Sequence, residues 1–318
     1  AKLPPIILAL DNDEAGRKAQ AEIKKMLDKD KIQSYSINLA LKYKDPNEAL
    51  QKEPQAFKGL IATLEDEDSI RQKEYLARTV EADLNSFLDF IKTKRAPAIS
   101  TGFKMLDDTL RGGLREGLIC VGGISSLGKT TLALQIMDNI AKQGQDVLIF
   151  SLEMSAHELR AKTIARESYN VAIEQTGFSQ DAVTTIEILD RELLQALPKQ
   201  NQATFTQAYG RYLKYAKHIF IHEAVGKFTV NDIKARVEEH IKATGRTPVI
   251  LVDYLQILQP AEPGLSDKAK VSYDVLMLKQ LSRDNHTPVM VISSFNRDSY
   301  DKSASFSSFK ESGEIEYS

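Results

Sequence analysis

A glycine-rich segment between an apolar run and an amphipathic stretch limits the folds open to this chain more than any other feature. Residues 123–130 read Gly-Ile-Ser-Ser-Leu-Gly-Lys-Thr and fit the pattern G-x-x-x-x-G-K-S/T of a phosphate-binding loop. The apolar residues 118–121 before it predict a strand, and residues 130–143 after it predict a helix. A strand, such a loop and a helix in this order are typical of proteins that bind a nucleoside triphosphate.

Each residue type in this loop has a physical role in holding a polyphosphate. The glycines let backbone N–H groups turn inward, Lys129 brings a mobile positive charge to the outer phosphates, and the Thr130 hydroxyl can hold Mg²⁺. The positive end of the following helix points at the same anion. We therefore predict a site for Mg²⁺ and ATP, or another NTP, formed by Gly123, Ser125, Ser126, Gly128, Lys129, Thr130 and Thr131.

The composition of the chain limits the cellular location and the partners that we expect. With 318 residues, 42% hydrophobic and 27% charged, it is long enough for a full domain and a smaller unit. No apolar run approaches the about 20 residues of a membrane span, and no signal peptide opens the chain, so we expect a cytoplasmic protein without membrane contact. Its single cysteine excludes an internal disulfide, and no histidine pairs with it at zinc spacing. A net charge of −2 means that DNA contact requires a local basic surface or a ring interior.

Strands and helices alternate through the C-terminal two thirds of the chain. Such alternation of apolar strands with helices indicates the α/β class, with a mainly parallel sheet covered by helices on both faces. Ligands of these sheets collect at the carboxyl ends of the strands. We predict strands near residues 118–122, 146–150, 218–221, 249–253 and 289–293.

Polar residues at the ends of three of these strands suit nucleotide hydrolysis. Asp253 closes a continuous apolar run and is the expected Mg²⁺ carboxylate opposite Thr130. Glu153 follows the second strand, where it can orient or deprotonate the attacking water, although a glutamate near a helix start is also stabilised by the helix dipole alone. The last strand leads either to a surface turn or to contacts with the outer phosphate through Ser294, Asn296 and Arg297.

Together these motifs resemble the motor domain of DnaB-like hexameric replicative helicases, a RecA-type ATPase. The resemblance covers residues 98–318 and implies that Glu153 is the catalytic base beside Lys129, that Asp253 is the Mg²⁺ carboxylate, and that 293–297 is the γ-phosphate sensor. The family usually has glutamine where this chain has Ser294. The matching segments are 101–107, 112–114, 151–155, 252–256 and 293–297.

The resemblance also implies partners and an assembly. It implies a homo-hexameric ring that acts on single-stranded DNA, with primase or other replisome components as partners. Residues 309–316 are similar to the family segment that precedes its last strands, so we expect a C-terminally truncated motor without the basic finger residues offered to a neighbour.

Residues 1–64 resemble part of a different family, the Toprim domains of primases. The match lies in Asp-Asn-Asp-Glu-Ala-Gly-Arg at 11–17 and Lys-Asp-Pro-Asn-Glu at 44–48, and it implies that Asp11 and Asp13 bind Mg²⁺. The alternative is a solvated turn whose aspartate caps a helix. The earlier Toprim strand with its catalytic glutamate is missing, and the order Toprim then motor resembles bacteriophage-type primase-helicases.

A linker helix is expected between the two parts, within residues 65–97. Its apolar residues recur at helical spacing and form one stripe, which either packs on its own chain or docks on a neighbouring subunit. The stripe consists of Leu76, Val80, Leu84, Phe87, Leu88 and Ile91.

Residues 259–271 are the best candidate for a DNA-contacting pore loop by the same resemblance. Prolines and a glycine give this segment an irregular path, and Lys268 and Lys270 suit phosphates. Two lysines usually serve only solubility, but sixfold repetition in a ring would concentrate them.

The leading hypothesis is an ATP-driven ring helicase that translocates on single-stranded DNA in replication. The alternative is a RecA-type recombination or regulatory ATPase without unwinding activity, in which nucleotide controls assembly. Primase or nuclease chemistry at Asp11 and Asp13 is a third interpretation, which lacks its glutamate.

Overall fold

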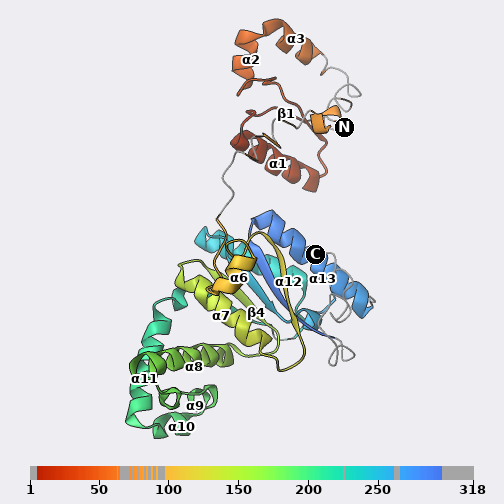
Figure 1. The fold of residues 1–318 in the computed structure, drawn as a ribbon. Helices are drawn as coiled ribbons and strands as arrows, with labels where there is room; N and C mark the ends of the chain where they lie inside the picture. Colours follow the sequence, from red (N-terminus) through yellow and green to blue (C-terminus); the bar gives the residue numbers. More distant parts are fainter. Residues whose placement is uncertain are drawn as a thin grey trace. The chain divides into compact units, whose positions relative to one another are not determined.

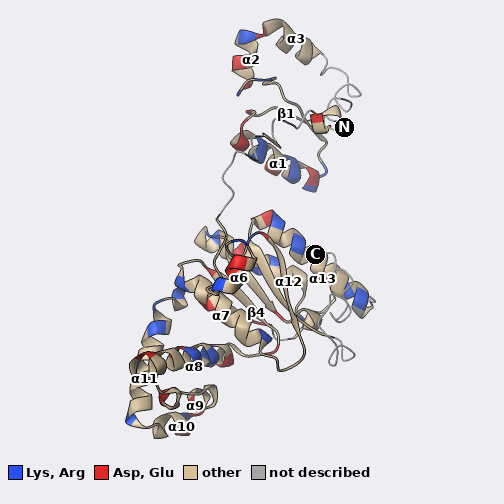
Figure 2. Cartoon of the chain, viewed as in Figure 1, with Lys and Arg blue, Asp and Glu red and all other residues tan. Residues whose placement is uncertain are grey.

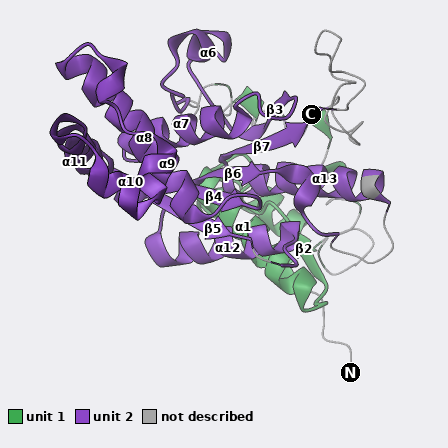
Figure 3. Ribbon diagram, turned by 90° about the horizontal axis from the view of Figure 1, so that it is seen from below, with its two compact units in different colours: residues 1–96 green, residues 97–318 purple. Residues whose placement is uncertain are grey.

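The computed structural model forms two compact units, residues 1–96 and 97–318 (Figure 3). Each unit is considered by itself. Among the helices that the structure describes, none combines the length and the apolarity needed to cross a membrane. The described residues are 6–62, 64, 97–224, 226–260 and 266–295, with single residues or short runs at 72, 75–77, 79–81, 84, 87, 88 and 91.

The first unit is a small β-α-β element followed by two short helices. Strand β1 (Ile6–Leu8) pairs in parallel with β2 (Ser34–Ser36), and helix α1 (Glu14–Lys29) connects them. Helices α2 (Pro46–Lys52) and α3 (Pro54–Ala62) follow. Positive and negative side chains are interspersed along α1 (Figure 2).

Two aspartates start the helices of this unit. Asp13 accepts a hydrogen bond from the Gly16 N–H at 2.8 Å, and Asp45 accepts one from the Glu48 N–H at 2.8 Å, so both act as N-caps. A Cβ on Gly16 would collide with the Asp11 carbonyl, which explains a glycine inside the first turn of α1.

The second unit contains a five-stranded, fully parallel sheet with the strand order β3-β7-β6-β4-β5 (Figure 1). The expected α/β fold with a mainly parallel sheet is therefore confirmed. The predicted start of the third strand at His218 is wrong, because His218 closes a 3₁₀ turn (Ala216–His218). The strands are β3 (Gly117–Gly123), β4 (Val147–Ser151), β5 (Ile219–Glu223), β6 (Val249–Asp253) and β7 (Pro288–Ser294).

Helices cover both faces of this sheet (Figure 1). Helices α7 (Lys129–Lys142) and α8 (Ala156–Gln175) pack on one face, together with alternate strand residues such as Val147 and Ile149. Helices α12 (Val230–Thr244) and α13 (Asp267–Asn285) pack on the other, against Leu148 and Phe150. The near-continuous apolar strands follow from burial on both sides. The short helix α6 (Lys104–Thr109) precedes β3.

The α7–α8 contact is fixed by charged groups inside the apolar layer. Asp138 of α7 is buried, accepts a hydrogen bond from the Thr163 hydroxyl at 2.8 Å and pairs with Arg166. Burial raises the pKa of the Asp138 carboxyl. Lys142 pairs with Glu167 one turn further along at 2.6 Å. These contacts hold α8 against α7.

The carboxyl edge of the sheet is less continuous than its centre. Strand β6 pairs with β7 only over Ile250–Val252 and Val289–Val291. Strand β7 continues beside β3 as far as the pair Gly123 and Ser294. The backbones of β6 and β7 are therefore not joined at the edge where ligands of parallel sheets bind.

The opposite, amino edge is held by the carboxylate of Asp146, which is 3% exposed. His218 Nδ1 lies 2.7 Å from Asp146 Oδ1, and Arg246 Nη1 lies 3.4 Å from the same oxygen. His240 Nε2 is 3.5 Å from Asp146 Oδ2. Asp146 precedes β4, His218 precedes β5 and Arg246 precedes β6, so one carboxylate connects the starts of three strands.

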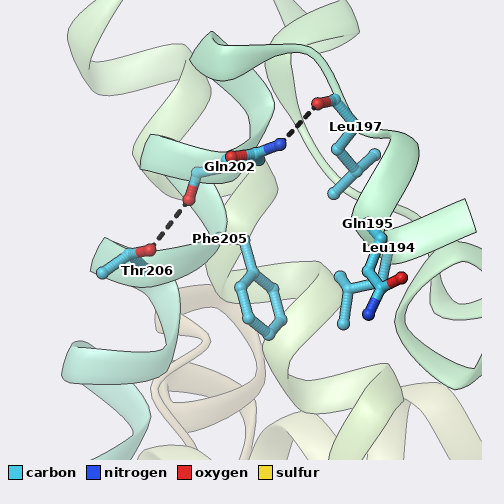
Figure 4. Close-up of a pocket in the computed structure, with 6 residues that line it drawn as sticks. All are labelled: Leu194, Gln195, Leu197, Gln202, Phe205 and Thr206. Atoms are coloured by element: carbon cyan, nitrogen blue, oxygen red, sulfur yellow. Dashed lines mark hydrogen bonds between the residues drawn. The ribbon is translucent and has the colours of Figure 1, made fainter. Parts of the chain in front are cut away.

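A helical extension lies between β4 and β5 in the sequence and projects beyond the sheet from the end of α8 (Figure 1). We define it as α8 with α9 (Thr185–Leu189), α10 (Arg191–Ala196) and α11 (Lys199–Leu213). A cavity of about 360 Å³ lies between α10 and α11, lined by Leu194 and Phe205 among others (Figure 4). The Gln202 amide donates to the Leu197 carbonyl at its rim at 2.8 Å.

Candidate functional site

The phosphate-binding loop connects β3 to α7, in agreement with the predicted strand and helix. Ser126 (φ 62°) and Gly128 (φ 89°) both have left-handed backbone conformations, so the loop curls back before the helix begins at Lys129. The Lys129 ammonium donates to the Ile124 carbonyl at 2.8 Å, across the loop. Among the other predicted loop residues, Ser125, Ser126, Gly128 and Thr131 are exposed.

Thr130 and Asp253 meet at the foot of this loop. The Thr130 hydroxyl donates to Asp253 Oδ2 at 2.8 Å, although the two residues are far apart in the sequence. Asp253 is 3% exposed, and burial raises the pKa of its carboxyl. The hydrogen bond from Thr130 and the charge of Lys129 act in the opposite direction. The site thus holds a desolvated carboxylate beside a hydroxyl and a cation.

Glu153 lies on the neighbouring strand end. Ser151 of β4 is in register with Asp253 of β6, and the Leu152 N–H donates to the Asp253 carbonyl at 2.8 Å. Glu153 is exposed, and its charge contributes to raising the pKa of Asp253 and of Tyr254. The two acidic side chains therefore project from adjacent strands at one edge, as the strand positions in the sequence suggested.

The end of β7 closes the site on the side of the loop. Ser294 pairs with Gly123, and the Phe295 N–H donates to the Gly123 carbonyl at 3.1 Å. Ser294, the expected sensor, is thus next to the first glycine of the loop. Asn296 and Arg297, the other expected sensor residues, lie outside the described residues.

The residues gathered here fit a magnesium ion. Mg²⁺ prefers oxygen ligands, commonly one or two carboxylates together with phosphate oxygens. Thr130 and Asp253 present a hydroxyl and a buried carboxylate within hydrogen-bond distance of each other. One hydrogen-bond donor compensates a buried carboxylate only in part, and a bound cation would complete the compensation.

Two polar residues near this edge were not predicted from the sequence. Lys162 of α8 is half-buried, and its charge opposes the rise that burial causes in the pKa of Asp253. Gln256, which follows β6, binds Ser293 and Ser294 through its side-chain amide. Gln256 belongs to the motif at 252–256, so its position in that motif was the signal available in the sequence.

The remaining predicted site residues lie elsewhere. Lys268 is exposed in the first turn of α13, whereas the Lys270 ammonium donates to the Gln256 carbonyl at 2.8 Å. In the first unit, Asp11 is exposed and Asp13 caps α1. The hydrogen bond from the Gly16 N–H is the main cause that lowers the pKa of Asp13. The described residues contain no group of three or more His, Cys, Asp or Glu side chains arranged to hold a metal ion.

A parallel sheet with a phosphate loop after β3 and acidic residues after β4 and β6 defines a P-loop nucleotide-binding protein of RecA-like fold. Residues 98–318 match the family described as DnaB-like helicase C terminal domain, and the chain belongs to this family. Residues 2–50 match a Toprim-like family. Both resemblances expected from the sequence are confirmed.

Individual relatives agree with this assignment. The replicative DNA helicase DnaB of Geobacillus stearothermophilus is 31% identical over 224 residues, which are 69% of this chain and 44% of the relative. The chain spans less than half the length of the curated relatives it matches.

Two solved structures share the fold. One, a structure of an ATPase domain, has a TM-score of 0.59 at 21% identity, and the match covers 76% of this chain and 80% of that domain. The other, a DnaB-like replicative helicase solved to show its interactions with primase, has a TM-score of 0.61 at 18% identity, and the match covers 96% of this chain and 66% of that helicase.

Proposed function

We propose that this chain is the motor of an ATP-dependent DNA helicase that translocates on single-stranded DNA during replication. The observation that carries the proposal is the convergence of the loop, Asp253 and Glu153 at one edge of the sheet. A loop that holds phosphates, a magnesium carboxylate and a second carboxylate are the parts that hydrolysis of a triphosphate requires. The similarity to replicative DNA helicases supports DNA unwinding as the work that this hydrolysis drives.

Each side chain has a defined task in the proposal. Lys129 leaves the Ile124 carbonyl and binds the outer phosphates, while Thr130 and Asp253 hold the magnesium ion. Magnesium, when bound, neutralises charge on the phosphate oxygens. Glu153 accepts a proton from the attacking water or orients that water, and its exposure leaves room for the water to approach. Ser294 contacts the outermost phosphate from the end of β7.

We further propose that the motor acts as a homo-hexameric ring, with nucleotide bound between neighbouring subunits and primase among its partners. Two exposed apolar surfaces support assembly. The stripe of the linker helix is exposed at its described residues Leu76, Val80, Leu84, Phe87, Leu88 and Ile91. The helical extension exposes Tyr169, Ile173, Phe178, Ile186, Leu189, Leu193, Tyr209 and Leu213.

These surfaces suit each other in a second copy of the chain. Exposed apolar patches of this kind are typical of protein interfaces, and a striped helix fits an apolar groove. In the proposed ring, the stripe of one subunit packs on the extension of the next. The proposed DNA contact that the structure leaves exposed, Lys268, is then repeated around a pore, which offsets the small net charge of each subunit.

Hydrolysis and unwinding measured on the purified protein test the proposal. We expect hydrolysis of ATP that single-stranded DNA accelerates, and separation of a forked duplex that requires hydrolysis. Ring formation and hydrolysis without strand separation would favour the RecA-type regulatory alternative. A protein that binds no nucleotide would contradict both.

A further inference from the structure

The Gln256 side chain occupies the gap between β6 and β7 at the nucleotide edge. Its Nε2 donates to the Ser293 hydroxyl at 2.7 Å, and its Oε1 accepts from the Ser294 N–H at 3.5 Å. Backbone pairing between these strands has already ended at Val252 and Val291. A side-chain amide has the same donor and acceptor as a peptide group, so Gln256 continues the ladder where the backbone does not.

The backbone of Gln256 is held from the opposite direction. Its carbonyl accepts a hydrogen bond at 2.8 Å from the Lys270 ammonium, and Lys270 is partly buried in the first turns of α13. Gln256 itself belongs to the short 3₁₀ turn Leu255–Ile257, which starts two residues after Asp253. One residue therefore contacts the end of β7 through its side chain and the start of α13 through its main chain.

Lys270 is accordingly engaged inside the subunit. Lys268, two residues earlier on the same helix, is exposed. The two lysines that the sequence assigned to DNA therefore differ: Lys268 is accessible to a phosphate, whereas Lys270 donates a hydrogen bond to the main chain that carries Gln256.

We infer that Gln256 is a positioning residue that fixes Ser294 against the outermost phosphate and transmits the position of β7 to α13 through Lys270. This inference deepens the proposed function and rests on it. Ser294 is shorter than the glutamine that is usual at this position, and the side-chain amide of Gln256 holds the end of β7 on which Ser294 lies. When the outermost phosphate is lost, the end of β7 shifts. Gln256 moves with it, because its side chain is hydrogen-bonded to Ser293 and Ser294. The hydrogen bond from Lys270 to the Gln256 carbonyl then transmits the shift to α13, the helix that bears Lys268.

Two pairs of variants separate this role from plain packing. Gln256→Ala removes both side-chain bonds, whereas Gln256→Glu keeps acceptors for the Ser294 N–H and the Ser293 hydroxyl. Lys270→Met removes the ammonium and keeps the length of the side chain, and Lys268→Met is its exposed control. For each variant the measurements are the affinity for a fluorescent ATP analogue, the basal hydrolysis rate, and the acceleration of hydrolysis by saturating single-stranded DNA.

We expect Lys270→Met to keep nucleotide affinity and basal rate. Both Lys270→Met and Gln256→Ala should lose about 2- to 30-fold of the DNA acceleration, expressed relative to the basal rate of the same variant, the range typical of residues that couple two sites. Gln256→Glu should restore much of the acceleration. The double variant should lose no more than either single one, because both residues act in one chain of contacts. Lys268→Met should instead weaken DNA binding, with a salt slope smaller by about 0.7 for each lost phosphate contact, and keep full acceleration at saturating DNA.

Hydrogen exchange gives a readout that does not depend on turnover. In the wild type, a nonhydrolysable ATP analogue should protect the amides of 289–295 and also those of 266–275. In Gln256→Ala the protection should stop at β7. If both regions remain protected in that variant, or if Lys270→Met behaves as Lys268→Met does, the inference is wrong.

Failure of the inference and failure of the proposed function give different results. A wild type without nucleotide hydrolysis contradicts the proposed function. A wild type with DNA-accelerated hydrolysis, together with normal acceleration in Gln256→Ala, contradicts only the role of Gln256. If Gln256→Ala does not fold, Lys270→Met and Gln256→Glu test the same chain of contacts.

Discussion

The Thr130 hydroxyl and the Asp253 carboxylate are joined by a hydrogen bond of 2.8 Å that closes the phosphate loop onto the end of β6. This bond links the first turn of α7 to the strand after which Gln256 lies. It also holds the two expected magnesium ligands side by side. A site arranged in this way loses little conformational freedom when the nucleotide enters.

Lys129→Ala should abolish nucleotide hydrolysis, because the loop then has no mobile charge for the outer phosphates. Release of phosphate, measured with saturating ATP and Mg²⁺, checks this expectation. Lys242→Ala, a change of the same kind on the exposed surface of α12, is the control and should keep the wild-type rate. Normal turnover in Lys129→Ala would refute the assignment of the site.

Glu153→Gln should keep nucleotide binding and lose about 10²- to 10⁴-fold of the hydrolysis rate, the usual contribution of a general base. The amide keeps the size of the side chain but cannot accept the proton from water. Single-turnover hydrolysis and analogue binding measure the two effects separately. Glu238→Gln, at an exposed position of α12, is the matched control. An unchanged rate in Glu153→Gln would mean that the glutamate only neighbours a helix start.

Asp253→Asn should raise the Mg²⁺ concentration needed for half-maximal hydrolysis by at least about tenfold, since loss of a group next to a metal typically costs this much affinity. The neutral amide still fills the buried space beside Thr130, so the fold should survive. A magnesium titration at fixed ATP checks the shift. Equal Mg²⁺ dependence in variant and wild type would remove Asp253 from the metal site.

Asp274 makes the stability of the second unit depend on pH. Its carboxylate is buried in α13 without a hydrogen-bond partner among the described residues, and burial raises its pKa to about 7, while the charge of Lys270 opposes the rise. A raised carboxyl pKa means that the unfolded state releases its proton first. The contribution of Asp274 to the free energy of unfolding is therefore fully present below its pKa of 3.8 in the unfolded chain, and it is lost as the pH rises through about 7.

Asp274→Asn, which does not titrate, measures this effect. The difference in unfolding free energy between wild type and variant should fall by up to about 4 kcal/mol between pH 4 and pH 8. Urea unfolding at several pH values, followed by circular dichroism, gives the difference. Parallel pH profiles for the two proteins would show that Asp274 is compensated in the folded state.

Deletion of residues 69–93 should convert the ring into monomers if the linker stripe docks on a neighbouring subunit. Removal of the stripe takes away the apolar contact that the helical extension would make, so association loses its main driving force. Sedimentation velocity with and without nucleotide distinguishes the species. Substituting aspartate for Phe178 and Ile186, both exposed on the extension, should have the same effect from the other side of the contact. An unchanged oligomer in the deletion would assign the stripe to its own chain.

The central elements of the fold could be predicted from sequence because their signals are strong and local. The fourth predicted strand matches β6 residue for residue, since five buried positions in a row end at a charged residue. The nearness of Asp253 to Glu153 followed from the rule that parallel strands share their carboxyl edge. These signals need no knowledge of side-chain packing.

Other features depend on tertiary contacts and were not predicted. The helices α9 and α10 are five and six residues long, too short for an apolar period to be recognised. His218 was assigned to a strand because it precedes an apolar run, but its ring faces Asp146 from a 3₁₀ turn. The role of Gln256 is visible only when the distance between β6 and Ser293 is known, because sequence spacing gives no information about a gap between strands.

The early end of pairing between β6 and β7 has an evolutionary consequence. Where a ladder of main-chain bonds joins two strands, every change of geometry disturbs the packed layers above and below. Here one side chain bridges the strand ends. Exchange of that residue during evolution would change the coupling between nucleotide and DNA without any change in the apolar layers.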